Sequence, residues 1–204
     1  GLLRRQRQMC IRDRYWMPDV FERFFNDFGK SSKNFYELKK LNPAYRVIFN
    51  KENQIQIGDN IDSISSQFEK IEKGSGEKLK KFLRESKENY DLAVTNMLYK
   101  MPGKSIFELI NSKTILKVNL FLSNIKKDIE KRFKDPKLRS VLQFPVLFLG
   151  AKPSNTPAFY NFMNYADFGL GTWQPKNGFY DVVKAMVNIA CLLYTSPSPR
   201  DRSS

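Results

Sequence analysis

The loop of residues 173–178 carries the residue types of this chain that are best suited to approach a bound molecule. It reads Trp-Gln-Pro-Lys-Asn-Gly and stands directly before a predicted helix. Proline and glycine favour a tight turn, and glycine also lets a backbone come close to a ligand. The loop therefore has two interpretations, a generic Pro-Gly turn or a loop beside a cofactor, and its candidate contacts are Trp173, Pro175, Asn177 and Gly178.

Other residue types are missing, and their absence excludes several kinds of site. The chain has no histidine, and its two cysteines, Cys10 and Cys191, lie near its ends. A histidine-based triad, an imidazole general base and a histidine-containing zinc site cannot be built from these residues. We therefore expect no metal site.

Aromatic residues are abundant, with 17 Phe and nine Tyr. They indicate either core packing or the lining of a cavity for a long apolar ligand. From the sequence alone, Trp16 and Met17 could pack as a hydrophobic staple against the following helix. The dipeptide Thr156-Pro157 is typical of a helix start, and a second aromatic group follows it. The candidates for substrate contact in this group are Phe159, Tyr160, Phe162 and Met163.

Hydrophobic spacing predicts the elements that must position these residues. Alternation on either side of a polar turn predicts a β-hairpin over 45–57, and Asp135-Pro136 reads as N-cap and first residue of a helix that bends at Pro145. The remaining periodic stretches predict helices over 18–28, 61–71, 79–97, 114–133, 157–163 and 179–190. The predicted fold class is α+β, mostly helical with one hairpin.

The two ends differ from the rest of the chain. Residues 1–14 and 191–204 show no helical or strand period, and the first segment alone holds five arginines of a chain with formal net charge +14. Both resemble translated sequencing adapter, so we expect them to be non-native tails that make no packed contacts. The alternative is a pair of native disordered tails. On the first interpretation, residues 15–190 are an internal fragment of a longer protein.

The predicted helix over 114–133 has one basic side and one apolar side. A solvated charged face and docking on an anionic membrane surface both explain this pattern, whereas nucleic-acid binding would need a recognition motif or interleaved aromatic residues that do not occur. We therefore expect no nucleic-acid partner. No apolar run approaches the ~20 residues of a spanning helix, so membrane contact would be interfacial. The candidate lipid-facing residues are Lys117, Lys126, Lys127, Lys131 and Arg132.

Three segments, residues 15–25, 148–160 and 171–178, together resemble the bacterial-type phytoene desaturases, which are amine-oxidase-like flavoproteins. The resemblance covers about residues 15–190 and implies FAD as cofactor. It also implies that Trp16 and Met17 are candidate lining residues of a flavin or polyene pocket. Asn177 departs from the family pattern W-x-P-x-G-G, in which a glycine is usual, and we expect the turn to survive because Asn tolerates positive φ. Residues 105–109 match the place of a proposed acidic catalytic residue and nominate Glu108, which could equally be a first-turn carboxylate.

The family opens with a G-x-G-x-x-G turn that holds the FAD pyrophosphate, and this chain contains no such turn. The resemblance therefore implies the substrate-binding and helical lid region of a two-domain FAD-dependent oxidoreductase, without its Rossmann parts. A fragment of this kind would neither hold FAD nor be active alone.

The resemblance implies that the parent enzyme introduces double bonds into a C40 isoprenoid such as phytoene. It would act in the cytoplasm at the membrane surface. Alternatives are another carotenoid oxidoreductase, such as a hydroxycarotenoid desaturase or a carotene isomerase, and a non-enzymatic helical module that binds membranes.

Overall fold

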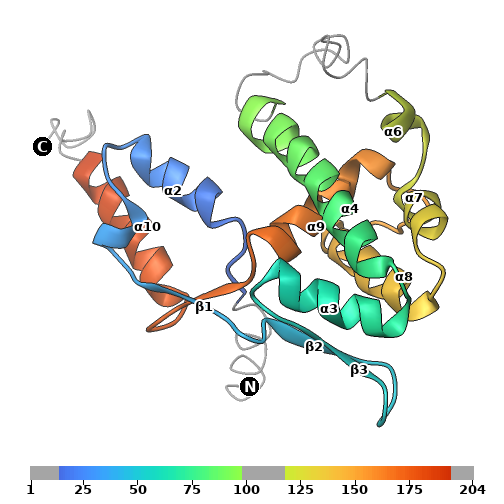
Figure 1. Ribbon diagram of the computed structural model, residues 1–204. Coiled ribbons are helices and arrows are strands. Elements are labelled where there is room, and N and C mark those ends of the chain that lie inside the picture. The colour runs from blue at the N-terminus through green and yellow to red at the C-terminus, as the bar shows by residue number, and fades with distance from the viewer. Residues whose placement is uncertain (1–13, 98–117, 194–204) are drawn as a thin grey trace, which may run out of the picture. The chain divides into compact units, whose positions relative to one another are not determined.

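The computed structural model describes residues 14–97 and 118–193, which form two compact units. Unit 1 combines the described residues up to Leu41 with those from Thr172 onward, and unit 2 is built from Asn42 to Gly171. Helices predominate in both, and the strands form two small antiparallel sheets (Figure 1). The expectation of a mostly helical α+β chain with a hairpin is confirmed, with a second two-stranded sheet added.

Unit 1 contains the helices α2 (Pro18–Asn26) and α10 (Tyr180–Leu193) and the strands β1 (Leu38–Lys40) and β4 (Trp173–Pro175). Its core is an apolar cluster from both helices and the segments before and after α2: Tyr15, Phe25, Tyr36, Val182, Ala185 and Ile189. The expectation that residues 191–204 lack helical structure is wrong for 191–193, because α10 continues to Leu193. The rest of that segment and residues 1–13 lie outside the described residues.

The predicted hairpin is present in unit 2, as β2 (Tyr45–Ile48) and β3 (Gln54–Ile57). Its register pairs Tyr45 with Ile57 and Val47 with Ile55. Asn50 fixes the turn, because its side-chain oxygen accepts hydrogen bonds from the backbone N–H groups of residues 52 and 53.

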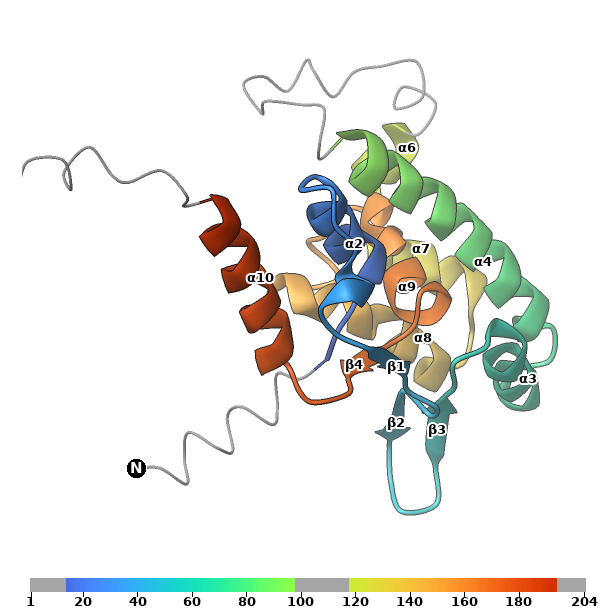
Figure 2. The same cartoon turned by 90° about the vertical axis from the view of Figure 1, so that its left-hand side faces the viewer.

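The next elements are α3 (Ile61–Ile71) and α4 (Ser75–Tyr90), which is followed directly by a π-helical segment (Asp91–Met97). The predicted helix 61–71 is confirmed. A Cβ on Gly76 would lie 2.9 Å from the backbone oxygen of Ser65, so glycine is what allows the two helices to approach here (Figure 2).

The single helix predicted over 114–133 is wrong. Within the described residues it is two helices, α6 (Val118–Leu122) and α7 (Ile125–Arg132). Asn124 separates them because its side chain caps α7 by accepting from Lys127 N, while the backbone of Ser123 accepts from Ala158 N at 2.7 Å. The bond to Ala158 is a tertiary contact that uses a carbonyl which a continuous helix would need, so periodicity alone could not reveal the break.

Asp135 caps α8 (Pro136–Gln143) as predicted, and the chain then tightens into a 3₁₀ segment at Pro145 (Phe144–Leu149). The prediction that Thr156 caps the aromatic helix is wrong. Thr156 donates its hydroxyl to the Lys152 backbone oxygen instead of capping the next helix. The aromatic helix is also irregular, because it passes from a 3₁₀ turn (Ala158–Asn161) through α9 (Phe162–Asn164) into a π-helical turn (Tyr165–Gly169).

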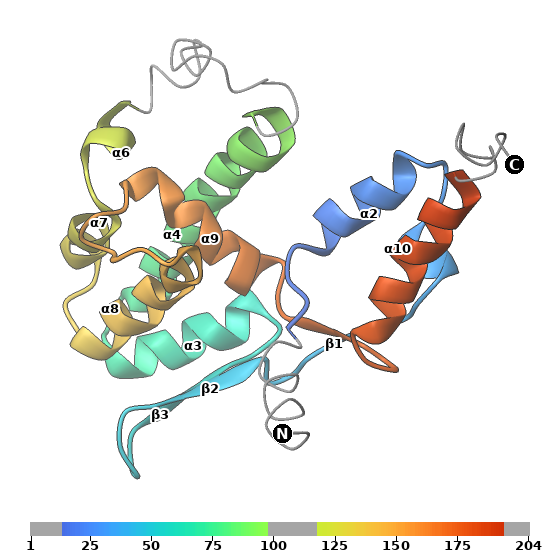
Figure 3. The same cartoon turned by 180° about the vertical axis from the view of Figure 1, so that it is seen from behind.

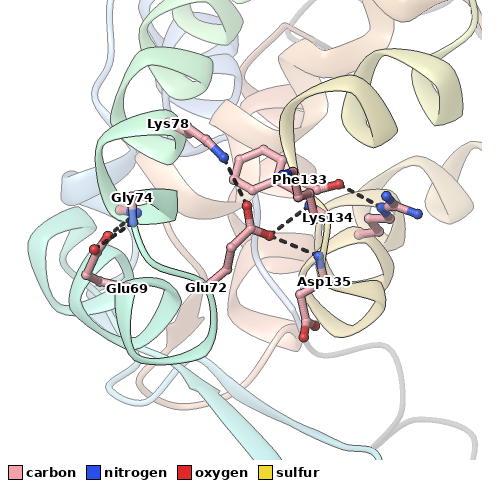
Figure 4. A network of polar contacts seen from close by, with 9 residues as sticks. Glu69, Glu72, Gly74, Lys78, Phe133, Lys134 and Asp135 are labelled. Atoms are coloured by element: carbon pink, nitrogen blue, oxygen red, sulfur yellow. Dashed lines mark hydrogen bonds and ion pairs between the residues drawn. The ribbon is translucent and has the colours of Figure 1, made fainter.

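Two carboxylates tie the turns of unit 2 together (Figure 4). Glu72 accepts hydrogen bonds from the backbone of Lys134 and Asp135, at 2.7 and 2.9 Å, and from Lys78 Nζ at 2.9 Å. Glu69 accepts from the backbone N–H groups of Gly74 and Gly76. Burial alone would raise the pKa of Glu72, but these hydrogen bonds outweigh it and lower the pKa.

Candidate functional site

Unit 1 brings together two of the segments that the sequence singled out. Tyr15 and Trp173 exchange both backbone hydrogen bonds, at 3.0 and 2.9 Å, and Trp173 also pairs with Lys40 of β1. The indole nitrogen of Trp16 donates to Thr172 Oγ1 at 2.9 Å. Side chains more than 150 positions apart in the chain therefore lie at one place in unit 1.

A cleft of about 610 Å³ opens beside this pairing. Trp173, Tyr36, Leu38 and Pro18 give it an apolar and aromatic lining, and its polar side chains are Asp19, Glu22, Ser32, Lys33 and Glu37. The cleft therefore combines aromatic surface with several charged groups, whereas the usual small-molecule site has fewer polar groups.

A chain of hydrogen bonds leads from the interior of unit 1 to this cleft. The hydroxyls of Tyr15 and Tyr36 lie 2.8 Å apart, Tyr36 interacts with Ser32, and Ser32 donates from both its N–H and its hydroxyl to Glu22. Burial is the main cause that raises the pKa of both tyrosines. Hydrogen bonds from Ser31 and Ser32 lower the pKa of Glu22, so Glu22 is ionised at neutral pH while the tyrosines keep their protons.

Met17 is the one non-glycine residue with positive φ in the described part of the chain, with φ 54° and ψ 58°. It stands between the Tyr15–Trp173 pairing and Pro18, which begins α2. Left-handed geometry costs an L-residue roughly 1–2 kcal/mol, so the surrounding contacts must hold it there.

The loop after β4 forms the predicted turn, but not through Asn177. Gly178 N donates to Pro175 O at 3.0 Å, and the positive φ of 95° belongs to Gly178. The side chain of Asn177 instead hydrogen-bonds Asp181 in the first turn of α10. Our expectation that the turn depends on the tolerance of Asn for positive φ is therefore wrong, because Asn177 does not adopt that geometry.

The second predicted set of contacts lies in unit 2. Phe159 and Met163 are buried, and Phe159 stacks on Phe121 with ring centroids 4.6 Å apart. Phe162 is half-buried and contacts Tyr160 and Tyr90 edge-on or tilted. The structure thus brings Phe159, Tyr160, Phe162 and Met163 together in one aromatic cluster, and Trp16, Met17 and Trp173 together in unit 1.

The basic candidates are not equivalent. Lys126, Lys127 and Lys131 are exposed on α7, with Lys126 3.9 Å from Glu130. Arg132 is held by Glu85 at 2.7 Å and Asp128 at 3.2 Å and lies over the ring of Phe82. Its charge is therefore already neutralised within unit 2, so it does not belong with the exposed lysines of α7. Lys117 and the catalytic candidate Glu108 lie outside the described residues.

Among the described residues, one Gly-x-Gly opens a helix and could therefore resemble a pyrophosphate site. It is Gly74-Ser75-Gly76, at the start of α4. The preceding element is the helix α3 instead of a strand, and the Glu69 carboxylate occupies the N–H groups of both glycines (Figure 4). These residues do not fit the pyrophosphate of a dinucleotide, because a carboxylate of the chain already holds the anion position.

Comparison with known proteins identifies the relatives of the chain. No protein-family model matches it. The carotenoid 3,4-desaturase of Haloarcula japonica is 35% identical over 177 residues, which is 86% of this chain and 36% of that protein. The chain is homologous to the carotenoid desaturases. Phytoene desaturase of Phycomyces blakesleeanus is 29% identical over 86% of the chain and 30% of its own length.

A 4,4'-diapolycopene oxygenase of a Methylomonas species is 25% identical over 85% of the chain and 35% of its own length. The chain thus spans about a third of the length of the carotenoid-desaturase relatives it matches. The suspected family is confirmed. No helix of the described residues has the length and apolar character that crossing a bilayer would require.

Sequence reasoning missed four polar members of the unit 1 site: Glu22, Ser32, Tyr36 and Thr172. No spacing signal connects them, since Thr172 meets Trp16 across 156 positions. Thr172 precedes the predicted site residue Trp173 directly, and Tyr15 precedes Trp16, whereas Glu22, Ser32 and Tyr36 have no predicted site residue beside them.

Proposed function

We propose that this chain forms the substrate-binding and helical region of an FAD-dependent carotenoid desaturase that introduces double bonds into a C40 isoprenoid. The observation that carries the proposal is the homology over 86% of the chain to a carotenoid 3,4-desaturase. The aromatic cleft of unit 1 supports it, because an isoprenoid offers only apolar surface to its site. The exact carotenoid is open, since these relatives include desaturases and an oxygenase.

Within this proposal, the cleft beside Trp173 is where the reacting part of the substrate or the flavin would lie. The proposed contacts in unit 1 are Trp16, Met17, Trp173, Pro175 and Gly178. Pro175 is buried and Asn177 is exposed and engaged with Asp181, so Asn177 is the weakest member of the original set. In unit 2, Phe159, Tyr160, Phe162 and Met163 would contact the apolar chain of the substrate.

Flavin would supply the hydride-accepting chemistry of a desaturation. FAD is proposed for the whole protein on the strength of the family, because the described residues do not fit its pyrophosphate. The 204-residue chain purified alone should therefore show no stoichiometric flavin absorbance. A bound-flavin band at one equivalent would contradict this assignment.

The substrate role can be tested in a phytoene-producing host that expresses the whole protein. Trp173→Ala should lower the yield of desaturated carotenoids at least tenfold, because it removes the largest aromatic group of the cleft. Tyr180→Ala is the matched control, since Tyr180 is an aromatic residue of unit 1 that is 68% exposed. Equal product from both variants at equal protein level would remove the cleft from the proposal.

A membrane-surface role is proposed in a narrower form. Leu122 is 82% exposed at the end of α6, only a few residues before the exposed Lys126 and Lys127 of α7. Exposed apolar and basic residues together favour an anionic lipid interface. Reversal of Lys126, Lys127 and Lys131 to Glu should weaken binding to acidic vesicles and remove its salt dependence. Unchanged binding would mean that these lysines are only solvated.

A further inference from the structure

Buried polar side chains line the packing of α4 against the segment that contains α9. Ser86 and Asn89 stand one turn apart on α4, and Asn161 and Asn164 stand one turn apart on the facing segment. All four are fully buried. Asn89 Nδ2 donates to Asn161 Oδ1 at 2.8 Å, so the two rows meet. The three views place α9 beside α4 (Figure 3).

Several atoms of these rows have no hydrogen-bond partner among the residues that the structure describes: Ser86 Oγ, Asn161 Nδ2, Asn164 Nδ2 and Asn164 Oδ1. Buried polar atoms are nearly always hydrogen-bonded, to protein or to ordered water, because leaving them unpaired forfeits their hydration. Both helices also change to π-helical hydrogen bonding just past these rows, over Asp91–Met97 and Tyr165–Gly169. Such turns are frequent at functional positions.

The chemistry of these atoms selects a neutral ligand. The two amide nitrogens only donate, which disfavours a metal cation, and no cationic side chain is among the four residues, which disfavours an anion. The nearby Asp167 carboxylate, which accepts a hydrogen bond from the Tyr45 hydroxyl, disfavours an anion further. Water both donates and accepts, and two to four polar partners are what a buried water requires.

We propose that the packing of α4 against residues 158–169 is a binding site for ordered water, held by Asn164 and Asn161 with Ser86 at its edge. The site is independent of the proposed desaturase activity and lies wholly within unit 2. Its water would act as part of the core, since it satisfies polar groups that no described side chain reaches.

The test uses the 204-residue chain. In the native protein, the side-chain amide of Asn164 should give nuclear Overhauser cross-peaks to water whose sign reports a long residence time. Asn164→Leu, which has a similar shape, should lower Tm by roughly 2–8 °C, because it removes a partner of the water and of the buried groups around it. Asn119→Leu is the control, since Asn119 is exposed on α6, and its Tm should stay unchanged.

If no water lies between α4 and residues 158–169, we expect the opposite results. Asn164→Leu would then raise Tm, because it removes an unpaired buried amide, and the native protein would show no water cross-peaks. Either result overturns the proposal. If Asn164→Leu does not fold, the cross-peaks of the native protein decide alone.

Discussion

Unit 1 closes by pairing residues from the two ends of the described chain, whereas unit 2 is built from one continuous stretch. In unit 1, Tyr15 pairs with Trp173 and Trp16 with Thr172. In unit 2, consecutive helices pack through short turns, such as the one between α3 and α4. The Trp16–Thr172 bond of unit 1 closes a loop of 156 positions, against 122 for the Tyr45–Asp167 bond of unit 2, and the entropy cost of closing a loop grows only slowly with its length.

The carboxylates of the two units also differ in what they serve. Glu69 and Glu72 are saturated by backbone N–H groups and hold turns in place. Glu22 is held from one side by Ser32 and also lines the cleft beside Trp173. Glu69 also lines a cleft, but both of its oxygens already accept hydrogen bonds, from Gly74 and Gly76, whereas Ser32 donates twice to the same oxygen of Glu22. Glu22 is therefore the carboxylate that we expect to be more available to a ligand.

The largest expected effect is in the core of unit 2. Phe133 is fully buried, with its ring edge-on to Phe68 and Phe82 at centroid distances of 6.2 and 6.3 Å. Phe133→Ala should destabilise the protein by about 3–5 kcal/mol, through lost burial and the cavity left behind. Thermal and urea unfolding measure this loss, and hydrogen exchange should show it in α4 and leave α10 unaffected. Equal loss of protection in α10 would mean that the units unfold together.

Glu72 should come next. Glu72→Ala leaves two backbone N–H groups and Lys78 without their acceptor, and should cost about 1.5–3 kcal/mol by urea unfolding. Because the folded pKa is lowered, the contribution of Glu72 is complete above its unfolded pKa of about 4.3 and is lost as pH falls through the folded value. The difference between native protein and Glu72→Gln should therefore shrink below about pH 4. A difference that persists there would show that the charge plays no part.

Local signals made the elements of unit 2 predictable. Asp135-Pro136 predicted the start of α8, and the alternation of apolar and polar residues predicted the hairpin. Both signals are local, because caps and strand faces depend on neighbours in the sequence. The break between α6 and α7 was missed, since it depends on Ser123 and Asn124 meeting residues 157 and 158. The irregular course of the aromatic helix was missed for the same reason.

The candidate site of unit 1 was also predictable only where local sequence signals exist. The resemblance nominated Trp16, Met17 and Trp173 separately, and their assembly with Glu22, Ser32 and Tyr36 needed the tertiary structure. Arg132 was placed with the exposed lysines because helical spacing shows which residues share a face but not which have partners. Its pairing with Glu85 of α4 is a long-range contact that no pattern reports.

A smaller effect is expected for the hydrogen-bonded chain of unit 1. Tyr36→Phe removes the partner of the Tyr15 hydroxyl and should cost about 1 kcal/mol by urea unfolding. Tyr160→Phe is the control, since Tyr160 is a half-buried aromatic residue of unit 2. The titration of Glu22, followed by carboxyl NMR, should also move, because Tyr36 contacts the Ser32 that donates to Glu22. An unmoved Glu22 titration would mean that the chain ends at Ser32.

The smallest expected effect concerns Met17 of unit 1, which among the described residues is the one non-glycine residue with positive φ. Met17→Gly should be more stable than Met17→Ala by about 0.4–1 kcal/mol, because glycine adopts the left-handed geometry without a Cβ clash and regains more than it loses in unfolded-chain entropy. The same pair at Lys81, exposed within α4 of unit 2, should show the opposite order, since alanine is the better residue in a helix interior. Urea unfolding of the four variants measures both differences. If alanine is favoured at both positions, the left-handed geometry of Met17 does not strain the chain.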